Sequence, residues 1–127
     1  APHPGEAAVL LGCSSADIQA DRIAAVKELQ RRYGGVAVLK GAGKLVATGH
    51  DVPSVSTSGN PGMAAAGMGD VLTGIIAALL AQGLSAEHAA CVGVESHARA
   101  GDIAARGGER GLIASDLLAA LRDVINP

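Results

Sequence analysis

Apolar positions recur at helical spacing along the first third of the chain. The segment from Pro4 to Leu11 has proline in its first turn and Gly12 directly after it, which predicts a short helix with these ends. A second helix is expected to begin at a polar cap and to run to about Tyr33, where Gly34 stops it. Its candidate caps are Ser14, Ser15 and Asp17, and its expected apolar stripe is Ile23, Val26, Leu29 and Tyr33.

A continuous apolar run follows, from Val36 to Leu39. Such a run predicts a strand buried on both faces of a parallel sheet. The segment from Lys40 to Lys44 then predicts a tight turn, and residues 45–48 are expected to return as an antiparallel partner. A helix, a glycine pair and a buried strand make up half of a βαβ unit, so the pattern favours an α/β fold.

The second half of the chain combines a long polar loop with apolar helices. The loop is expected from Gly49 to Gly69, and a loop of this length inside a compact domain is usually functional. No internal repeat or linker interrupts the chain, which indicates one domain or part of one. The expected helices are Asp70 to Ala81, a helix capped by Ser85 that runs to about Ala105, and Asp116 to Ile125 with Ser115 as its cap.

Composition supports an α/β protein built from small side chains. Glycine accounts for 18 of the 127 residues, and 49% of the chain is apolar, yet Tyr33 is its sole aromatic residue. The core is therefore expected to consist of alanine, valine, leucine and isoleucine with closely packed backbones. Glycine and alanine in this proportion favour tight turns between strands and helices.

Charge and hydropathy exclude two classes of partner. The net charge is −2 and the cations are scattered, so neither a basic stripe nor base-stacking aromatics indicate nucleic acid. The apolar run from Val71 to Leu84 is broken by polar residues and glycines, so no membrane span is expected. Cys13 and Cys91 are isolated, which predicts two reduced thiols in a cytoplasmic protein.

Two generic phosphate-binding motifs fail on this sequence. A Walker A loop that ends in Gly43-Lys44 would need glycine at position 38 and a hydroxyl residue at 45, where the chain has Val38 and Leu45. A dinucleotide-binding fingerprint begins at Gly67 but has Leu72 in place of its last glycine. The chain therefore has neither a standard P-loop nor a standard Rossmann site.

The glycine-rich segment before the helix at Asp70 nevertheless favours an anion. Backbone amides and the helix dipole at such a terminus attract phosphate, and glycine lets a ligand approach the backbone. Asp70 is then either a base or metal partner, or a first-turn carboxylate that stabilises the dipole by about 0.3–1 kcal/mol. Lys40, at the end of the expected strand, either contacts a ligand or extends to solvent. A terminal histidine and a helical histidine are usually structural or solvated, and this is the ordinary interpretation of His3 and His97.

Three motifs, in order, resemble those of the NAD(P)H-hydrate dehydratases. Residues 59–72 read GNPGMAAAGMGDVL and closely resemble the signature of that family. Residues 2–6 read PHPGE and residues 38–43 read VLKGAG, and both look like further motifs of the same family. The similarity continues to Pro127, and three ordered motifs are far more specific than a single glycine loop.

This resemblance implies a ribokinase-like α/β fold, with a mainly parallel sheet flanked by helices and often assembled as a homotetramer. Residues 1–127 would be the C-terminal portion of one such domain. The implied activity is that of a hydro-lyase that dehydrates hydrated NADH or NADPH with ADP or ATP as co-substrate and Mg²⁺, in nicotinamide nucleotide repair. The composition is of a bacterial kind, and on that basis we favour ADP over ATP.

The resemblance also implies roles for individual residues. Asp70 matches the residue at the hydrated nicotinamide and is the expected catalytic base, and His3 matches a histidine that contacts the substrate. Gly69 matches a nucleotide-binding glycine. The remaining residues that match the nucleotide-binding stretch are Lys40, Gly41, Ala42, Gly43 and Lys44.

Two departures from the family pattern bear on these expectations. Lys44 stands where the family commonly has threonine, so a cation replaces a hydroxyl. Family members also carry a long segment before the PHPGE motif, so we expect the chain alone to be an incomplete catalytic unit whose partner is the missing part of the same domain. The alternatives are a small-molecule kinase of the same superfamily and a nucleotide-binding fragment without turnover.

Overall fold

The computed structural model describes residues 1–126, and Pro127 lies outside the described residues. The chain divides into two compact units, one from Ala1 to Val55 and the other from Ser56 onward. No helix among the described residues is long and apolar enough to cross a membrane.

The first unit begins with the helix that the sequence predicts. Helix α1 spans Pro4–Leu11, and Gly12 ends it in the left-handed conformation at φ 70°. His3 is its N-cap: its ring Nδ1 accepts the amide proton of Glu6 at 3.2 Å, and its own amide donates to the Glu6 carboxylate at 2.7 Å. This reciprocal capping fixes the entry to the helix.

The single helix predicted up to Tyr33 is wrong, because the chain forms two. Helix α2 spans Ser15–Ala20 and helix α3 spans Arg22–Tyr33. Asp21 separates them, since its backbone is non-helical (φ −145°, ψ 84°) and its carboxylate caps α3 by accepting the amide of Ala24 at 2.9 Å. A capping aspartate competes with continued helix at that position.

The apolar stripe predicted for this helix is only half right. Val26 and Leu29 are buried together with Ala25, whereas Ile23 is 49% exposed and Tyr33 is 58% exposed. Tyr33 is the last residue of α3, and its hydroxyl donates to the carbonyl of Leu10 at 2.8 Å. Its ring lies at the end of the packed face because the hydroxyl requires a polar partner.

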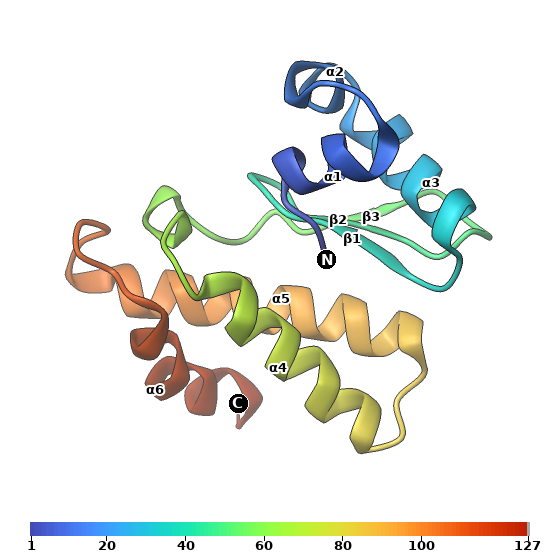
Figure 1. The fold of residues 1–127 in the computed structure, drawn as a ribbon. Helices are drawn as coiled ribbons and strands as arrows, with labels where there is room; N and C mark the ends of the chain where they lie inside the picture. The colour runs from blue at the N-terminus through green and yellow to red at the C-terminus, as the bar shows by residue number, and fades with distance from the viewer. Residues whose placement is uncertain (127) are drawn as a thin grey trace. The chain divides into compact units, whose positions relative to one another are not determined.

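A small antiparallel sheet lies against α3. Its strands are β1 (Ala37–Leu39), β2 (Leu45–Ala47) and β3 (Ser54–Val55), in the order β1-β2-β3. Leu39 pairs with Leu45, which confirms the antiparallel return, and every strand pair among residues 1–126 is antiparallel. The parallel neighbours that the sequence predicts for β1 are therefore not among these strands. Figure 1 shows α1 and α3 on one face of this sheet.

The core of the first unit consists of aliphatic side chains, as the composition predicts. Helix α3 packs on β1 and β2, and α1 packs on α3. This packing leaves the turn between β1 and β2 at the surface, where residues 41 and 42 are exposed. The buried side chains of this core are Ala7, Ala8, Ile18, Ala25, Val26, Leu29, Leu39, Leu45 and Ala47.

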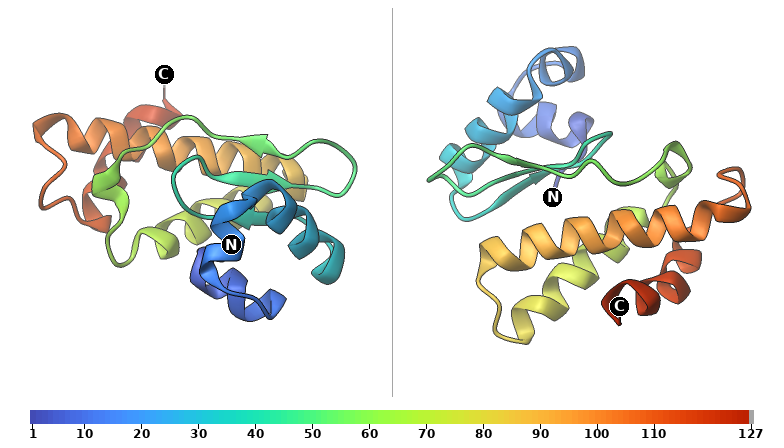
Figure 2. Two further views of the ribbon diagram at one scale, coloured as in Figure 1. Left: turned by 90° about the horizontal axis from the view of Figure 1, so that it is seen from above. Right: turned by 180° about the vertical axis from the view of Figure 1, so that it is seen from behind.

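In the second unit, residues 56–126 form three α-helices and two 3₁₀ turns. Helix α5 (Ala86–Ala104) packs against both α4 (Met68–Ala81) and α6 (Ala114–Ile125), and Figures 1 and 2 show both helices lying along it. A Cβ added at Gly93 of α5 would lie 2.7 Å from the Cγ1 of Ile76 in α4, so these helices approach closely. One core cluster of this unit consists of Met68, Ala100, Leu112, Leu117 and Ala120.

Several predicted boundaries in this unit were wrong by a few residues. Both α4 and α6 begin two residues earlier than predicted. Ser115 lies inside α6, because the Asp116 carboxylate accepts the amide of Ile113 at 3.0 Å and so caps the helix from within. Ser85 does cap α5, as predicted. The segment predicted as one loop from Gly49 to Gly69 contains β3 and a 3₁₀ turn, η1 (Pro61–Met63).

Candidate functional site

In the first unit, two of the sequence motifs lie together. The amide of Lys40, at the end of β1, donates to the carbonyl of Pro2 at 2.8 Å. The Lys40 ammonium lies 3.5 Å from Oε2 of Glu6, the same oxygen that accepts the His3 amide. The structure therefore brings His3 and Lys40, residues 37 positions apart in the sequence (40 − 3), to one carboxylate.

This arrangement also sets the charge of Glu6. The hydrogen bond from the His3 amide is the main cause that holds the pKa of the Glu6 carboxyl below its usual value, and the nearby Lys40 ammonium adds to the effect. Glu6 is thus an anion that balances Lys40 while the lysine side chain remains half-buried. The sequence motif contained Glu6, but sequence reasoning assigned it no role.

The turn from Lys40 to Lys44 is attached to α3 by Arg22. The Arg22 guanidinium donates through Nη2 to the carbonyl of Lys40 at 3.2 Å and through Nη1 to the carbonyl of Ala42. Gly41 adopts φ +128°, a conformation that side chains rarely adopt, and a Cβ there would lie 3.0 Å from Arg22 Nη2. Sequence reasoning missed Arg22, because nothing in its local pattern indicates which loop it contacts.

In the second unit, Gly67 directly precedes α4 as its N-cap, and no side chain caps this end of the helix. Gly67 adopts φ +82°, and a Cβ there would lie 3.1 Å from the Cβ of Ala114, so both conformation and space favour glycine. Its carbonyl accepts the amide of Asp70 at 3.0 Å. The Gly69 amide has no hydrogen-bond partner among residues 1–126. This helix end therefore presents a polar donor next to a carboxylate.

Asp70 is exposed in the first turn of α4, directly after Gly69. The helix dipole and the Gly69 amide provide positive potential at this point, while the Asp70 carboxylate provides a base. Gly69 and Asp70 thus lie together as the signature motif requires. They belong to the second unit, whereas His3 and the Lys40–Lys44 turn belong to the first.

A buried histidine holds the start of α4. His97 of α5 is 2% exposed, and its Nε2 lies 2.9 Å from the carbonyl oxygen of Met68. Because a carbonyl can only accept, Nε2 carries the proton in this contact. This buried position agrees with the structural role expected for His97, but no local sequence pattern indicates its contact with Met68.

Two carboxylates of α5 hold the polar segment that precedes α4. Glu95 accepts the hydroxyl protons of Ser56 at 3.0 Å and Ser58 at 2.9 Å, and Asp102 accepts the amide of Gly59 and the side-chain amide of Asn60, both at 2.9 Å. The segment that the sequence marks as functional is therefore anchored to a helix. Its polar side chains serve that attachment.

The pKa of Glu95 reflects these contacts. Burial works to raise the pKa of this carboxyl, but the hydrogen bonds from Ser58, Ser56 and Arg99 outweigh it and leave the pKa below its usual value. Glu95 is therefore the charged acceptor of three donors. Its ionisation is linked to the attachment of residues 56–58.

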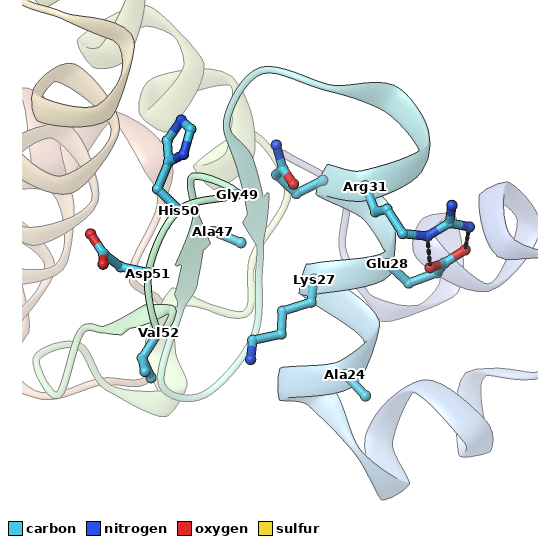
Figure 3. A pocket seen from close by; sticks show the side chains of 10 residues that line it. Ala24, Lys27, Glu28, Arg31, Ala47, Gly49, His50, Asp51 and Val52 are labelled. Carbon is cyan, nitrogen blue, oxygen red and sulfur yellow. Dashed lines mark hydrogen bonds and ion pairs between the residues drawn. The ribbon is translucent and has the colours of Figure 1, made fainter.

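A separate pocket of about 810 Å³ lies within the first unit, between α3 and the loop that follows β2. Figure 3 shows Lys27 and the Glu28–Arg31 ion pair on one side, with His50, Asp51 and Val52 opposite. None of the residues that the sequence assigns to the site lines this pocket. Among residues 1–126 no group of three or more metal-ligating side chains forms a metal centre.

Comparison with known proteins gives a family. The family model described as NAD(P)H-hydrate dehydratase matches residues 1–123. The chain belongs to the NAD(P)H-hydrate dehydratase family. This confirms the resemblance predicted from the three motifs.

Individual relatives agree with this assignment. The chain is 57% identical over 127 residues to the bifunctional NAD(P)H-hydrate repair enzyme of Escherichia coli. This match covers 99% of this chain and 25% of that protein. It is 47% identical over 123 residues to the ADP-dependent (S)-NAD(P)H-hydrate dehydratase of Neisseria meningitidis, covering 95% of this chain and 42% of the relative. The chain therefore spans about a quarter of the length of the first relative and just over two fifths of the length of the second.

Similar solved structures confirm the ribokinase-like fold. The ADP/ATP-dependent NAD(P)H-hydrate dehydratase of Bacillus subtilis, co-crystallised with ATP and Mg²⁺, superimposes with a TM-score of 0.92 at 28% identity, over 98% of this chain and 46% of that one. A ribokinase-like superfamily protein of Enterococcus faecalis gives a TM-score of 0.81 at 29% identity, over 98% of this chain and 43% of that one. The small antiparallel sheet and the helices are thus a portion of that larger fold.

Proposed function

We propose that the protein to which this chain belongs is a nucleotide-dependent hydro-lyase that dehydrates hydrated NADH or NADPH. The observation that carries the proposal is the first turn of α4, where exposed Asp70 follows the unbonded amide of Gly69. A base beside an anion-binding amide is the combination that phosphorylation and loss of a hydroxyl group require. The dehydratases among the relatives support this reaction over simple nucleotide binding.

The proposed chemistry assigns a separate task to each of these groups. Asp70 removes the proton of the substrate hydroxyl as the hydroxyl oxygen attacks the terminal phosphorus of the nucleotide. The bond between that phosphorus and the rest of the nucleotide breaks, and AMP leaves when ADP is the co-substrate. The Gly69 amide and the dipole of α4 stabilise the negative charge on the transferring phosphoryl group. The lone pair of the ring nitrogen then expels phosphate, a better leaving group than hydroxide, and leaves an iminium cation. Loss of a proton from the neighbouring ring carbon to solvent restores the double bond and regenerates the dihydronicotinamide.

In the first unit we assign nucleotide binding to the turn between β1 and β2, which comprises Lys40, Gly41, Ala42, Gly43 and Lys44. The Lys40 ammonium supplies charge, and the Gly41 and Gly43 amides, which have no hydrogen-bond partner among the described residues, supply donors. We assign His3 to the substrate, since its exposed ring lies at the start of α1.

The co-substrate is an adenine nucleotide, and we propose ADP over ATP because the Neisseria relative is named ADP-dependent. Mg²⁺ is proposed to enter with the phosphates, as it commonly binds through one or two carboxylates and substrate phosphates. Asp70, in the first turn of α4, is the carboxylate that directly follows Gly69 in the chain. A cytoplasmic location and a homotetrameric assembly remain predictions. Light scattering on the intact protein would measure the oligomeric state.

The decisive experiment incubates the intact protein with hydrated NADH and either ADP or ATP. We expect NADH absorbance to return in step with the release of inorganic phosphate, and neither to occur without nucleotide. Phosphorylation of the substrate without recovery of NADH would instead indicate a kinase. Nucleotide binding without either product would contradict the dehydratase assignment.

A further inference from the structure

Arg22 has an unusual set of contacts for a surface arginine. It is the first residue of α3, its side chain is half-buried, and its guanidinium donates to two backbone carbonyls of one turn, those of Lys40 and Ala42. It forms no ion pair among residues 1–126. The adjacent carboxylate, Asp21, is already engaged in capping α3.

These two hydrogen bonds determine the direction of two other groups. A trans peptide is planar, so its carbonyl and the following amide point in opposite directions. The described chain contains no cis peptide bond. Because the carbonyls of Lys40 and Ala42 point toward Arg22, the amides of Gly41 and Gly43 point away from it.

Both of these amides remain available to a ligand. Neither donates a hydrogen bond within residues 1–126. Gly41 at φ +128° and Gly43 at φ +62° place no side chain over them, and both conformations strongly favour glycine. Two outward amides in one turn, separated only by Ala42, are backbone donors of the kind that bind phosphoryl oxygens.

We propose that Arg22 is a positioning residue of the nucleotide-binding turn, which aims the Gly41 and Gly43 amides at the phosphates by holding the carbonyls behind them. The proposal rests on the nucleotide binding assigned above to Lys40–Lys44. The planar guanidinium is essential, since its fork can bond two carbonyls in fixed directions, whereas a lysine ammonium is a single flexible point charge. The contacts of Arg22 are with the backbone, so its effect on the ligand passes through the turn.

The test measures the Kd of ADP and of adenosine by calorimetry on the intact protein and on three variants. Arg22→Met removes both hydrogen bonds, Arg22→Lys keeps the charge, and Arg31→Met is the control on the same helix, where the arginine is paired with Glu28. We expect both Arg22 variants to weaken ADP binding about tenfold or more, while adenosine affinity changes by less than about threefold. The control should bind ADP like the parent.

The outcomes separate this proposal from the one on which it rests. If the parent binds ADP and both Arg22 variants bind it equally well, the positioning role is wrong although the nucleotide assignment stands. Parallel loss of ADP and adenosine affinity would also overturn it, because an effect on the amides acts on phosphates. A parent that binds neither ADP nor ATP would overturn both proposals. If Arg22→Met does not fold, as judged by circular dichroism, Arg22→Lys decides the question.

Discussion

The ammonium of Lys40 lies 3.5 Å from the carboxylate of Glu6, which also accepts the amide of His3 at 2.7 Å. One carboxylate thus links the helix that begins the chain to the turn that follows β1. The two motifs that form this contact are separated by α2 and α3 in the sequence. A phosphate that approaches Lys40 therefore competes with Glu6 for the same cation.

The first prediction concerns Lys40. Lys40→Ala should weaken ADP binding by about 1.5–3 kcal/mol, the typical contribution of a charge-assisted hydrogen bond, and should change thermal stability little. Calorimetric titration of the intact protein would measure the affinity. Lys27→Ala, an exposed lysine of α3, is the matched control and should bind ADP normally. Unchanged affinity in Lys40→Ala would leave Lys40 as a solvated partner of Glu6.

The second prediction concerns Asp70. Asp70→Asn should lower turnover by about 10²–10⁴-fold, because the amide has nearly the same shape but cannot accept the proton. ADP affinity should hold or rise, since a carboxylate that repels phosphate is removed. Turnover of hydrated NADH and the melting temperature would be measured together.

The alternative role of Asp70, stabilisation of the helix dipole, gives the opposite pattern. If Asp70 has only this role, Asp70→Asn would reduce the free energy of unfolding by less than about 1 kcal/mol and leave turnover almost unchanged. Asp123→Asn, on the last turn of α6, provides a control for the loss of one exposed aspartate. Turnover of Asp70→Asn within a few-fold of the parent would end the catalytic assignment.

The third prediction concerns pH. The pKa of Glu95 is lowered in the folded protein, so its contribution to stability is present above the unfolded value of 4.5 and is lost as pH falls through the folded value. Acid should therefore weaken the hydrogen bonds to Ser56 and Ser58. Glu95→Gln should destabilise the protein at neutral pH and should make stability less dependent on pH below about 4.5.

Acid unfolding followed by circular dichroism would measure this effect. Glu87→Gln is the control on the same helix, because Glu87 is exposed and lacks the serine partners. If Glu95→Gln and the parent lose stability along parallel curves as pH falls, the linkage between Glu95 and the attached segment is wrong.

The fourth prediction concerns His97. His97→Leu removes the donor that lies 2.9 Å from the Met68 carbonyl and places an apolar side chain in the buried position. We expect a loss of about 1–3 kcal/mol in unfolding free energy, because a buried carbonyl loses a partner. Turnover should fall in kcat more than KM rises, since Gly69 and Asp70 follow Met68 directly. His88 is exposed on the same helix, and His88→Leu should leave the free energy of unfolding and the turnover unchanged.

The sequence alone determined most of the local structure of this protein, together with its family. Helix α1 and its ends followed from Pro4 and Gly12, and the turn between β1 and β2 followed from an apolar run that ends at Leu39. Such features depend on backbone conformation and on periodic burial, which neighbouring residues specify. The three motifs likewise gave the candidate site residues, because each motif is contiguous.

Only the tertiary structure decided which residues support those motifs. Arg22, Glu6, Glu95 and His97 act on segments up to 39 residues away, and no local pattern records such contacts. The break at Asp21 was also missed, because a capping carboxylate and a helical surface residue look alike until the chain direction is known. A side chain that donates to a distant backbone carbonyl supplies the hydrogen bond that this carbonyl requires. The fold alone determines where that carbonyl lies.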